Sequence, residues 1–317
     1  MATLILGAVQ LGLLYGIMAL GMYISFRILN VPDLTTDGSI ILGMSVCAML
    51  SAAGHPYLGL LIAILSGAAA GVASGILQTK IGIHPVLSGI LVMTSLYSVC
   101  LFVTGGKSNV SLNGKETFFT QIRNFFQNIF PEMDPVLAKN IAHTVGALLF
   151  AAVLAAILAV FFKTRSGITI RATGDNEDMV RSSSINAAFT KCVGLAIANA
   201  CVALSGALIS QYQMYFDAGF GTGMSVIGLA SVIIGETVCG RRSVTVGLIS
   251  AFIGSIIYRI IVAAALKVEL LPTYGFKLVS ALIVVIALAA PKIKEAAGIH
   301  KIRKNALKTE LEGGKQA

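Results

Sequence analysis

Residues 142–162 read AHTVGALLFAAVLAAILAVFF, an apolar run without a single Lys, Arg, Asp or Glu. A helix needs roughly 20 mostly apolar residues to cross the hydrocarbon core of a bilayer, and this run has that length. Lipid offers no hydrogen-bond partner to an irregular backbone, so such a run crosses the membrane as a helix. The chain therefore contains at least one predicted transmembrane helix.

Similar apolar runs fill most of the chain. Of its 317 residues, 56% are hydrophobic and 12% are charged, whereas soluble domains average about 25% charged residues. The predicted fold is an all-α integral membrane protein with about nine transmembrane helices, with a transmembrane domain over residues 1–290 and a basic tail over 291–317. The predicted spans are 4–26, 38–53, 58–78, 85–104, 142–162, 191–211, 222–239, 244–265 and 274–290.

The net charge of +9 is concentrated in the loops and the tail, and the tail holds seven Lys or Arg against three Glu. Cytoplasmic loops carry the excess of Lys and Arg, so this distribution predicts a multi-pass protein of the cell membrane, surrounded by lipid, rather than a nucleic-acid-binding protein. Counting back from a cytoplasmic tail places residues 163–190 inside and residues 105–141 and the N-terminus outside. Residues 118–130 have the spacing of an amphipathic helix on the membrane surface.

The reactive side chains form no recognisable catalytic or metal-binding pattern. The five cysteines include no C-x-x-C pair and the four histidines are scattered, so we expect no metal, cofactor or catalytic residue. The cysteines are predicted to be small buried residues. Glycine recurs at every fourth position at Gly67, Gly71 and Gly75, a spacing that predicts close helix packing.

The polar stretch NVPDLTTDGS, residues 30–39, lies between the first two spans. Its proline and glycine break helices, and its Thr-Asp pair can cap a new one. One interpretation is an ordinary cytoplasmic turn. The other is a break inside a span that exposes backbone and hydroxyls to a translocation path, which lipid tolerates only where the break is buried in protein or lines a cavity. The candidate path residues are Asp33, Thr35, Thr36, Asp37 and Gly38.

A second polar stretch, residues 163–190, reads KTRSGITIRATGDNEDMVRSSSINAAFT. We expect Gly174 to end one helix and Asp175 to cap a short one through Met179 and Val180. Such a helix, apolar amid charges, suits docking into a groove on a partner. A plain cytoplasmic loop is the alternative.

This second stretch resembles the cytoplasmic loop of ABC-importer permeases that serve branched-chain amino acids, ribose-type sugars and nucleosides. The resemblance rests on Ser166-Gly167, Ile170-Arg171-Ala172, Gly174-Asp175-Asn176 and Ser184-Ile185-Asn186, with Ser184 where that family usually has Gly. It implies a coupling helix near 175–184 that inserts into the ATPase subunit. The implied coupling residues are Arg171, Ala172, Gly174, Asp175, Asn176, Met179 and Val180.

The stretch PDLTTDG, residues 32–38, resembles the P-D-L-T-x-D-G segment of a branch proposed to import aromatic amino acids or related solutes. Relatives carry a segment at this place that lines the substrate path. The resemblance implies a type II importer fold, an ABC ATPase, an extracytoplasmic substrate-binding protein and a second permease copy, giving a homodimer. ATP hydrolysis belongs to the ATPase, since the incomplete phosphate-loop match ending at Gly106-Lys107-Ser108 has Leu101 where its first glycine belongs.

Charges and aromatic residues near the spans carry three further expectations. Arg259 lies well inside a span and is expected to reach the outer interface or pair between helices. Glu236 is expected to pair with Arg241 or Arg242. Residues 211–223 are expected to form an interfacial aromatic belt, the alternative being an outer mouth of the path.

Two rival classes remain to be weighed. A stand-alone secondary transporter or channel would use Asp33 and Asp37 for ion coupling, but such folds carry matching interrupted segments in two halves, and the break near 28–38 has no visible mate. A membrane-embedded enzyme would need clustered catalytic pairs within spans, and we find none. The prediction is thus a permease subunit, not an enzyme, for a small amino-acid or nucleoside-like solute.

Overall fold

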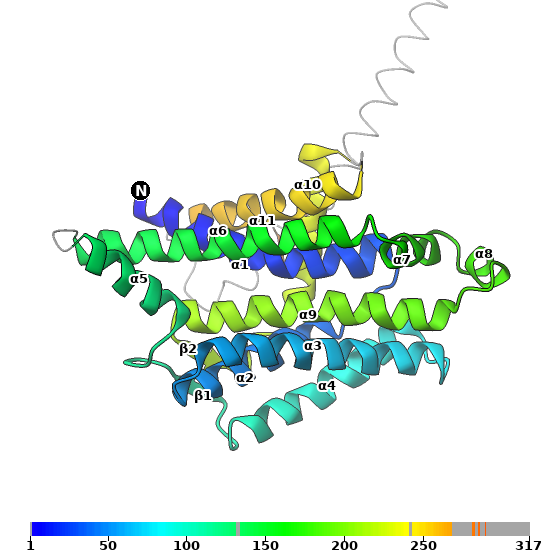
Figure 1. The fold of residues 1–317 in the computed structure, drawn as a ribbon, viewed down its shortest axis with the longest axis horizontal. Helices are drawn as coiled ribbons and strands as arrows, with labels where there is room; N and C mark the ends of the chain where they lie inside the picture. Colours follow the sequence, from blue (N-terminus) through cyan, green and yellow to red (C-terminus); the bar gives the residue numbers. More distant parts are fainter. Residues whose placement is uncertain are drawn as a thin grey trace, which may run out of the picture.

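The computed structural model describes residues 2–130, 134–240 and 243–267, with the single residues 281, 282, 285 and 289. The described part is a helical bundle with one two-stranded antiparallel sheet at one end (Figure 1). Its elements are α1 (Ala2–Met22), the π-helical η1 (Tyr23–Ile28), α2 (Thr36–Ala52), α3 (Pro56–Thr79), α4 (Pro85–Val103), β1 (Asn109–Ser111), α5 (Phe118–Ile129), α6 (Pro135–Phe161), α7 (Arg165–Asp175), α8 (Glu177–Ser182), α9 (Ala187–Gln213), β2 (Tyr215–Asp217), α10 (Met224–Cys239) and α11 (Val244–Lys267).

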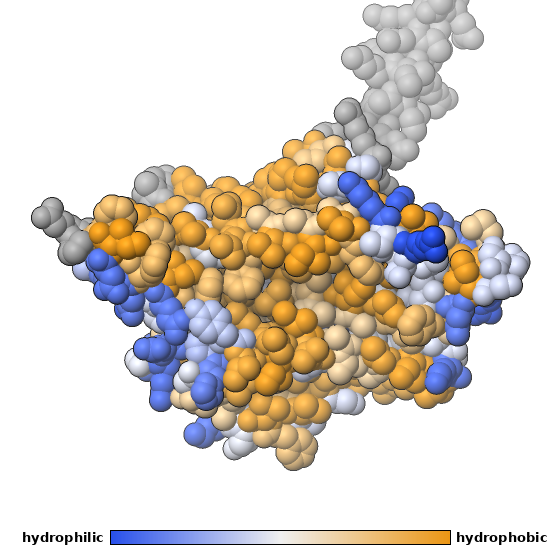
Figure 2. Space-filling view, viewed as in Figure 1, coloured by the Kyte–Doolittle hydropathy of each residue, from blue (hydrophilic) through white to orange (hydrophobic). Residues whose placement is uncertain are grey.

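Every predicted span that the structure describes coincides with an apolar helix. Among the described residues, seven helices are long and apolar enough to cross a bilayer, and α10 is a shorter apolar helix. Together they match the first eight predicted spans. The ninth span, 274–290, lies almost wholly outside the described residues, as do Arg241, Arg242 and the basic tail. Apolar side chains cover the middle of the bundle and hydrophilic ones gather at its two ends (Figure 2), as a membrane protein requires.

The two polar segments lie at opposite ends of the bundle, as predicted. The end with α7 and α8 is opposite to the end with α5, β1, β2 and the N-terminus (Figure 1). The amphipathic helix predicted over 118–130 is α5, which begins with a capping box at Thr117. Residues 163–190 form two helices rather than a plain loop.

Helix α2 begins near the middle of the bundle rather than at one of its ends. Asn199 lies 12 residues after the start of the 27-residue α9 and 14 before its end, which places it about 18 Å along that helix. The Ser39 hydroxyl donates to the Asn199 carboxamide oxygen at 2.7 Å, so the first turns of α2 lie at the same depth. The segment 29–35 thus enters the bundle from the α7 end. It is a break inside a span, and its interpretation as an ordinary cytoplasmic turn is wrong.

A second break precedes α10 and is the mate that was not visible in the sequence. Asn30 and Met214 both adopt a left-handed backbone (φ 54° and 61°) where η1 and α9 end, a conformation typical of helix C-termini. After Met214 the chain forms β2 and then descends to Gly221, which packs on the start of α2. Both breaks therefore bring a helix N-terminus to mid-depth.

The packing of the helices around the two breaks is that of an inverted repeat. α1 packs on α9, and their contacts pair Gly21 with Ala198 and Leu14 with Ser205, so the two helices are antiparallel. In one half α2 packs on α3 and α3 on α9; in the other α10 packs on α11 and α11 on α1. A secondary transporter is therefore not excluded by the absence of a repeat, because the fold has one.

Glycines let these helices approach at backbone distance, as their spacing predicts. A Cβ at Gly67, Gly71 or Gly75 would clash with α9, and one at Gly43 would clash with the carbonyl oxygen of Ala203. At each site the obstacle includes the backbone of α9, which cannot rotate aside. Close packing of small residues is what holds helices together in lipid, where apolar burial alone gives no net attraction.

The Gly43→Ala variant tests this packing, with Gly7→Ala as the matched control. Gly43→Ala forces α2 from α9, and overpacking of this kind costs about 1–3 kcal/mol. At Gly7 a Cβ meets nothing within 4 Å, so there alanine gains helix propensity, about 1 kcal/mol. Thermal unfolding in detergent should therefore show a lower midpoint for Gly43→Ala only. Equal midpoints for the two variants would refute the close approach.

Candidate functional site

The first break is fixed by the carboxyl group of Asp33, which is fully buried. One carboxyl oxygen accepts the backbone N–H of Thr35 at 2.9 Å, and the other accepts the side-chain amide of Asn199 at 2.8 Å. Asn199 in turn accepts from Ser39. These bonds satisfy an irregular backbone where lipid could not, and they tie the break to the middle of α9.

Asp37 links the two breaks. Its carboxyl oxygens accept the backbone N–H of Gly223 at 3.0 Å and of Ser225 at 2.6 Å. These groups are free donors of the first turn of α10, so Asp37 from α2 caps a different helix. Ser225 also shares a 2.6 Å hydrogen bond with the Thr36 hydroxyl. The N-termini of α2 and α10 therefore meet at mid-depth around one half-buried carboxyl.

The remaining candidate path residues lie in the same cluster. Thr35 and Thr36 are buried, and the Thr35 hydroxyl has no hydrogen-bond partner among the residues described. Gly38 lets α2 approach the backbone of Met93 in α4, because a Cβ there would lie 2.9 Å from its Cα. The structure thus brings all five candidates together, four buried and Asp37 half-buried. Whether they contact solute stays a prediction.

Two partners of this cluster were missed in the sequence. Asn199 stands alone among apolar residues in the middle of a span, and Ser225 lies early in another. A polar side chain inside a transmembrane helix usually faces the bundle and bonds to a polar partner, so Asn199 could have been identified as the partner of a nearby carboxyl. Nothing in the sequence pairs Ser225 with Asp37, which lies 188 positions away.

At the other candidate site, α7 and α8 form a helical elbow. Asn176, not Asp175, caps α8: its side chain accepts the backbone N–H of Met179 at 3.0 Å. The predicted stop at Gly174 is also wrong, because α7 continues through Gly174 to Asp175. A Cβ at Gly174 would clash with the carbonyl oxygen of Ile28, so this glycine serves the contact of α7 with η1.

The elbow presents most of the predicted coupling residues to solvent. Arg171, Asp175 and Asn176 are exposed, and Met179 is 53% exposed. Val180 is buried and Ala172 and Gly174 are half-buried, so they hold the elbow rather than offer a contact surface. Ser184, the residue that replaces the family's usual Gly, has a left-handed backbone with φ 60°, the conformation that glycine adopts most readily.

Glu177 holds α8 against α9. Its carboxylate pairs with Lys191 of α9 and, at 2.7 Å, with Arg181 one turn along. Partial burial of Glu177 favours its neutral form, but Lys191 and Arg181 outweigh this and leave its pKa lowered from the ordinary 4.5. The pair is therefore charged at neutral pH.

Three other expectations have different outcomes. Arg259 pairs between helices, with its guanidinium 3.4 Å from the ring centroid of Tyr15, as predicted. Glu236 pairs at 2.5 Å with Arg27, 209 positions away; the arginines predicted for it are outside the described residues. The belt interpretation is wrong for Gln211, which is buried and bonds to Cys47, Ser51, Pro56 and Phe118, and for the buried Phe216.

Three of the five cysteines are buried, as predicted, and Cys192 and Cys239 are half-buried. Cys47, Cys100 and Cys201 are buried and all five cysteines are free thiols, as expected of structural residues. Within the described residues no group of three or more His, Cys, Asp or Glu could hold a metal ion.

The sequence model of the family described as branched-chain amino acid transport system / permease component matches residues 4–288. The chain belongs to this family. It is a multi-pass membrane permease, and the predicted family and fold class are confirmed. The match spans both breaks, α7 and α8, and most of the ninth predicted span.

Three relatives show the same coverage. A tyrosine transport system permease protein of Clostridioides difficile is 36% identical over 287 residues, 90% of each chain. An uncharacterized protein of Rickettsia prowazekii is 28% identical, over 92% of this chain and 98% of its own. A fructose import permease protein of Bifidobacterium longum is 25% identical, over 86% and 74%. No solved structure was found to match.

Replacing Asp33 tests the hydrogen bonds of the first break. Asp33→Ala leaves without an acceptor the Thr35 N–H and one N–H of the Asn199 amide, whose other N–H donates to the Leu195 carbonyl oxygen. Each buried unsatisfied group costs about 1–3 kcal/mol. Its thermal midpoint in detergent should fall clearly, whereas Asp178→Ala, at an exposed carboxylate of α8, should leave it unchanged. A stable Asp33→Ala variant would contradict the arrangement.

Replacing Glu177 tests how α8 is held. Glu177→Gln should raise amide hydrogen exchange over residues 177–183 by roughly two- to five-fold, since partly exposed ion pairs contribute about 0–1 kcal/mol. Because the folded pKa is lowered, the pair contributes fully above the ordinary pKa and is lost as pH falls through the folded value. Protection should thus be flat from pH 6 to 8 and drop only in strong acid. Asp178→Asn is the control, and an unaltered exchange rate in Glu177→Gln would exclude the role.

Proposed function

We propose that the chain is the translocation subunit of an ATP-driven importer and that α8, with the exposed side of α7, is its docking surface for a separate ATPase subunit. Family membership supports the importer. The docking assignment rests on one observation: at the end predicted to be cytoplasmic, the elbow exposes Met179 beside Asp175 and Asn176 while its neighbour Val180 is buried. An exposed apolar side chain ringed by polar ones is what a short helix entering a protein groove presents.

The break segment fits the same proposal as a support of the path. Asp33, Thr35, Thr36 and Gly38 are buried and Asp37 is half-buried in this conformation, so they would meet solute only in another state of the cycle. Their present contacts hold two helix N-termini at mid-depth. Irregular backbone at that depth is tolerated where it is buried in protein or lines a cavity.

The other partners follow from the family. An extracytoplasmic binding protein would deliver solute at the end with α5 and the β1–β2 sheet, and a second copy of the chain would complete the path. The solute is an amino acid or a sugar-like or nucleoside-like compound. The tyrosine and fructose permeases among the relatives support these classes.

A stand-alone secondary transporter is the second candidate, because the inverted repeat and the mid-depth helix N-termini occur in that class. In it, Asp33 and Asp37 would bind the coupling ion. The structure gives these carboxyls protein donors instead: Asp33 binds Thr35 and Asn199, and Asp37 binds Gly223 and Ser225.

Co-purification separates the two candidates. The tagged chain in mild detergent should bring down an ATP-hydrolysing subunit, and a Gly/Ser linker in place of residues 171–184 should abolish this. Asp175→Ala with Met179→Ala should weaken the association at least ten-fold and uncouple ATP hydrolysis from uptake. The matched control is Lys115→Ala with Glu116→Ala, an exposed pair in the segment at the opposite end.

The outcomes are distinguishable. Full ATPase stimulation in the Asp175/Met179 variant would exclude α8 as the docking helix while leaving the importer in place. Absence of any ATPase from the intact chain would favour the stand-alone transporter.

A further inference from the structure

A cavity of about 700 Å³ lies beside the start of α10, within the range of small-molecule sites. Its walls come from α1, the second break, α10 and α11, with Ala281 of the ninth predicted span. Two charged residues line it, Arg259 and Asp217, together with three aromatic ones, Tyr15, Phe220 and Tyr258. Asp37 also contacts this wall. It accepts a hydrogen bond from the backbone N–H of Gly223, and Gly223 lines the cavity.

Arg259 is arranged to receive an anion. Its guanidinium carbon lies 3.4 Å from the centroid of the Tyr15 ring. Its Nε is buried and has no hydrogen-bond partner in the described part of the chain. The in-plane edge of a guanidinium is the part that binds a carboxylate with two parallel hydrogen bonds. A charged side chain inside a membrane bundle is costly, and such residues commonly mark a functional site.

Asp217 supplies the opposite charge on the same cavity. One of its carboxylate oxygens accepts the backbone N–H of Gly219 at 2.8 Å, which orients the group. Asp217 and Arg259 form no ion pair with each other, although both face the cavity. The two charges are therefore available to different ends of one ligand.

The aromatic side chains favour a ring on that ligand. Tyr15 and Phe220 lie 6.3 Å apart between centroids, tilted by 40°, and Tyr258 is buried nearby. Ile227 and Val262 complete an apolar wall. Aromatic rings pack on such walls in tilted or edge-on geometry.

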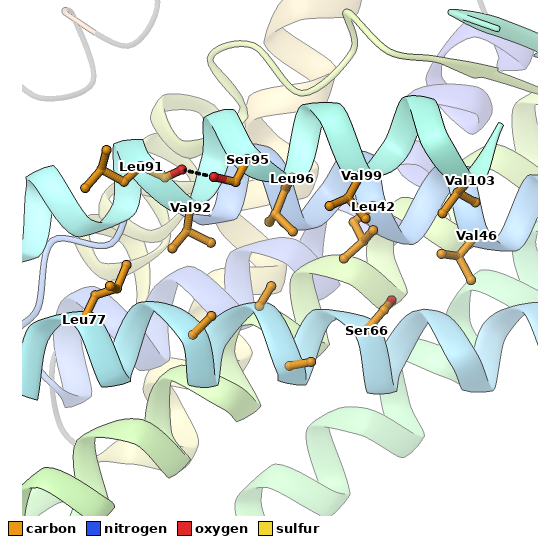
Figure 3. A pocket seen from close by; sticks show the side chains of 13 residues that line it. Leu42, Val46, Ser66, Leu77, Leu91, Val92, Ser95, Leu96, Val99 and Val103 are labelled. Carbon is orange, nitrogen blue, oxygen red and sulfur yellow. Dashed lines mark hydrogen bonds between the residues drawn. The ribbon is translucent and has the colours of Figure 1, made fainter. Parts of the chain in front are cut away.

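Another crevice of similar volume, in the first repeat, has a different lining. A crevice of about 650 Å³ between α2, α3 and α4 of the first repeat is lined by Leu, Val, Ala and two Ser without any charged or aromatic residue (Figure 3). That crevice contains no residue of α9 or of the first break, whereas the cavity beside α10 includes residues of α1 and of the second break. The charged and aromatic lining belongs to the second crevice.

From this geometry we propose that the cavity binds an aromatic amino acid as its zwitterion on the way through the permease. Arg259 binds the carboxylate, Asp217 binds the ammonium group, and the ring packs against Tyr15, Phe220 and Tyr258. The proposal rests on the transport function proposed above and names its substrate class. Asp37 is a positioning residue for the cavity, because it acts through α10.

Photolabelling of the full-length protein in lipid nanodiscs tests the site without transport. The probe is 4-azidophenylalanine, and the competitors are tyrosine, tyramine, which lacks the carboxylate, and 3-(4-hydroxyphenyl)propionate, which lacks the ammonium group. Labels should map by mass spectrometry to the second break and α11. Tyrosine should compete about 10–100-fold better than either analogue, the factor expected for one hydrogen bond to a charged group.

Each variant should remove one preference only. In Arg259→Met, tyrosine and tyramine should compete equally. In Asp217→Asn, tyrosine and the propionate should compete equally. Arg259→Lys should keep part of the preference for a carboxylate, because lysine retains the positive charge. This variant tests the role of that charge even if Arg259→Met fails to fold. Ser95→Ala, in the first-repeat crevice, should change nothing.

Two results would overturn the proposal: labels elsewhere in the chain, or a uniform loss for all competitors in Arg259→Lys and Asp217→Asn, which would mark the two residues as structural. ATPase co-purification, measured on the same variants, should be unchanged. Intact ligand preferences without any associated ATPase would contradict the importer but not the site. An associated ATPase with no ligand preference would contradict the site alone.

Discussion

The bundle depends on one constraint: two helix N-termini lie at mid-depth, where neither water nor lipid can satisfy their backbone. The structure meets it with two carboxyl groups from a single short segment. Asp33 binds its own break to the middle of α9, and Asp37 crosses over to cap α10. A buried carboxyl is expensive unless its oxygens are bonded. Here Asp33 bonds to Thr35 and Asn199, and Asp37 caps α10. The same segment thus closes both halves of the inverted repeat.

Features set by neighbouring residues in the chain could be predicted from the sequence, whereas features set by distant contacts could not. Apolar runs identify spans because twenty residues suffice to cross the bilayer, and Pro32 and Gly38 marked the first break. The second break was missed because it contains no proline and few charged residues. From hydropathy alone, residues 212–221 were assigned to an outer loop. The position of the second break is fixed by its hydrogen bonds to Asp37, which is far away in the chain. Hydropathy cannot predict a contact between residues so far apart in sequence.

Local chemistry was ambiguous in a similar way at α7 and α8. Asp175 and Asn176 are equally good caps by residue type, and only the path of α7 over η1 selects Asn176. Gly174 looked like a helix stop because glycine ends many helices, yet here it allows a helix crossing. Ser184 shows the converse: a left-handed turn survives the loss of glycine, at a cost of about 1–2 kcal/mol for a residue with a side chain.

The contacts of η1 and the first break connect the elbow to the cavity. α7 lies against Ile28 through Gly174, and Leu29 packs on Gly194 of α9. Arg27 of η1 holds the far end of α10 through Glu236, while Asp37, ten residues on, holds its start. Both ends of the helix that walls the cavity are therefore attached to the stretch from Arg27 to Asp37. Packed elements shift as units rather than deform continuously, so a partner that moves α7 would move α10 with this stretch. It could do so only by binding one arrangement more tightly than the other.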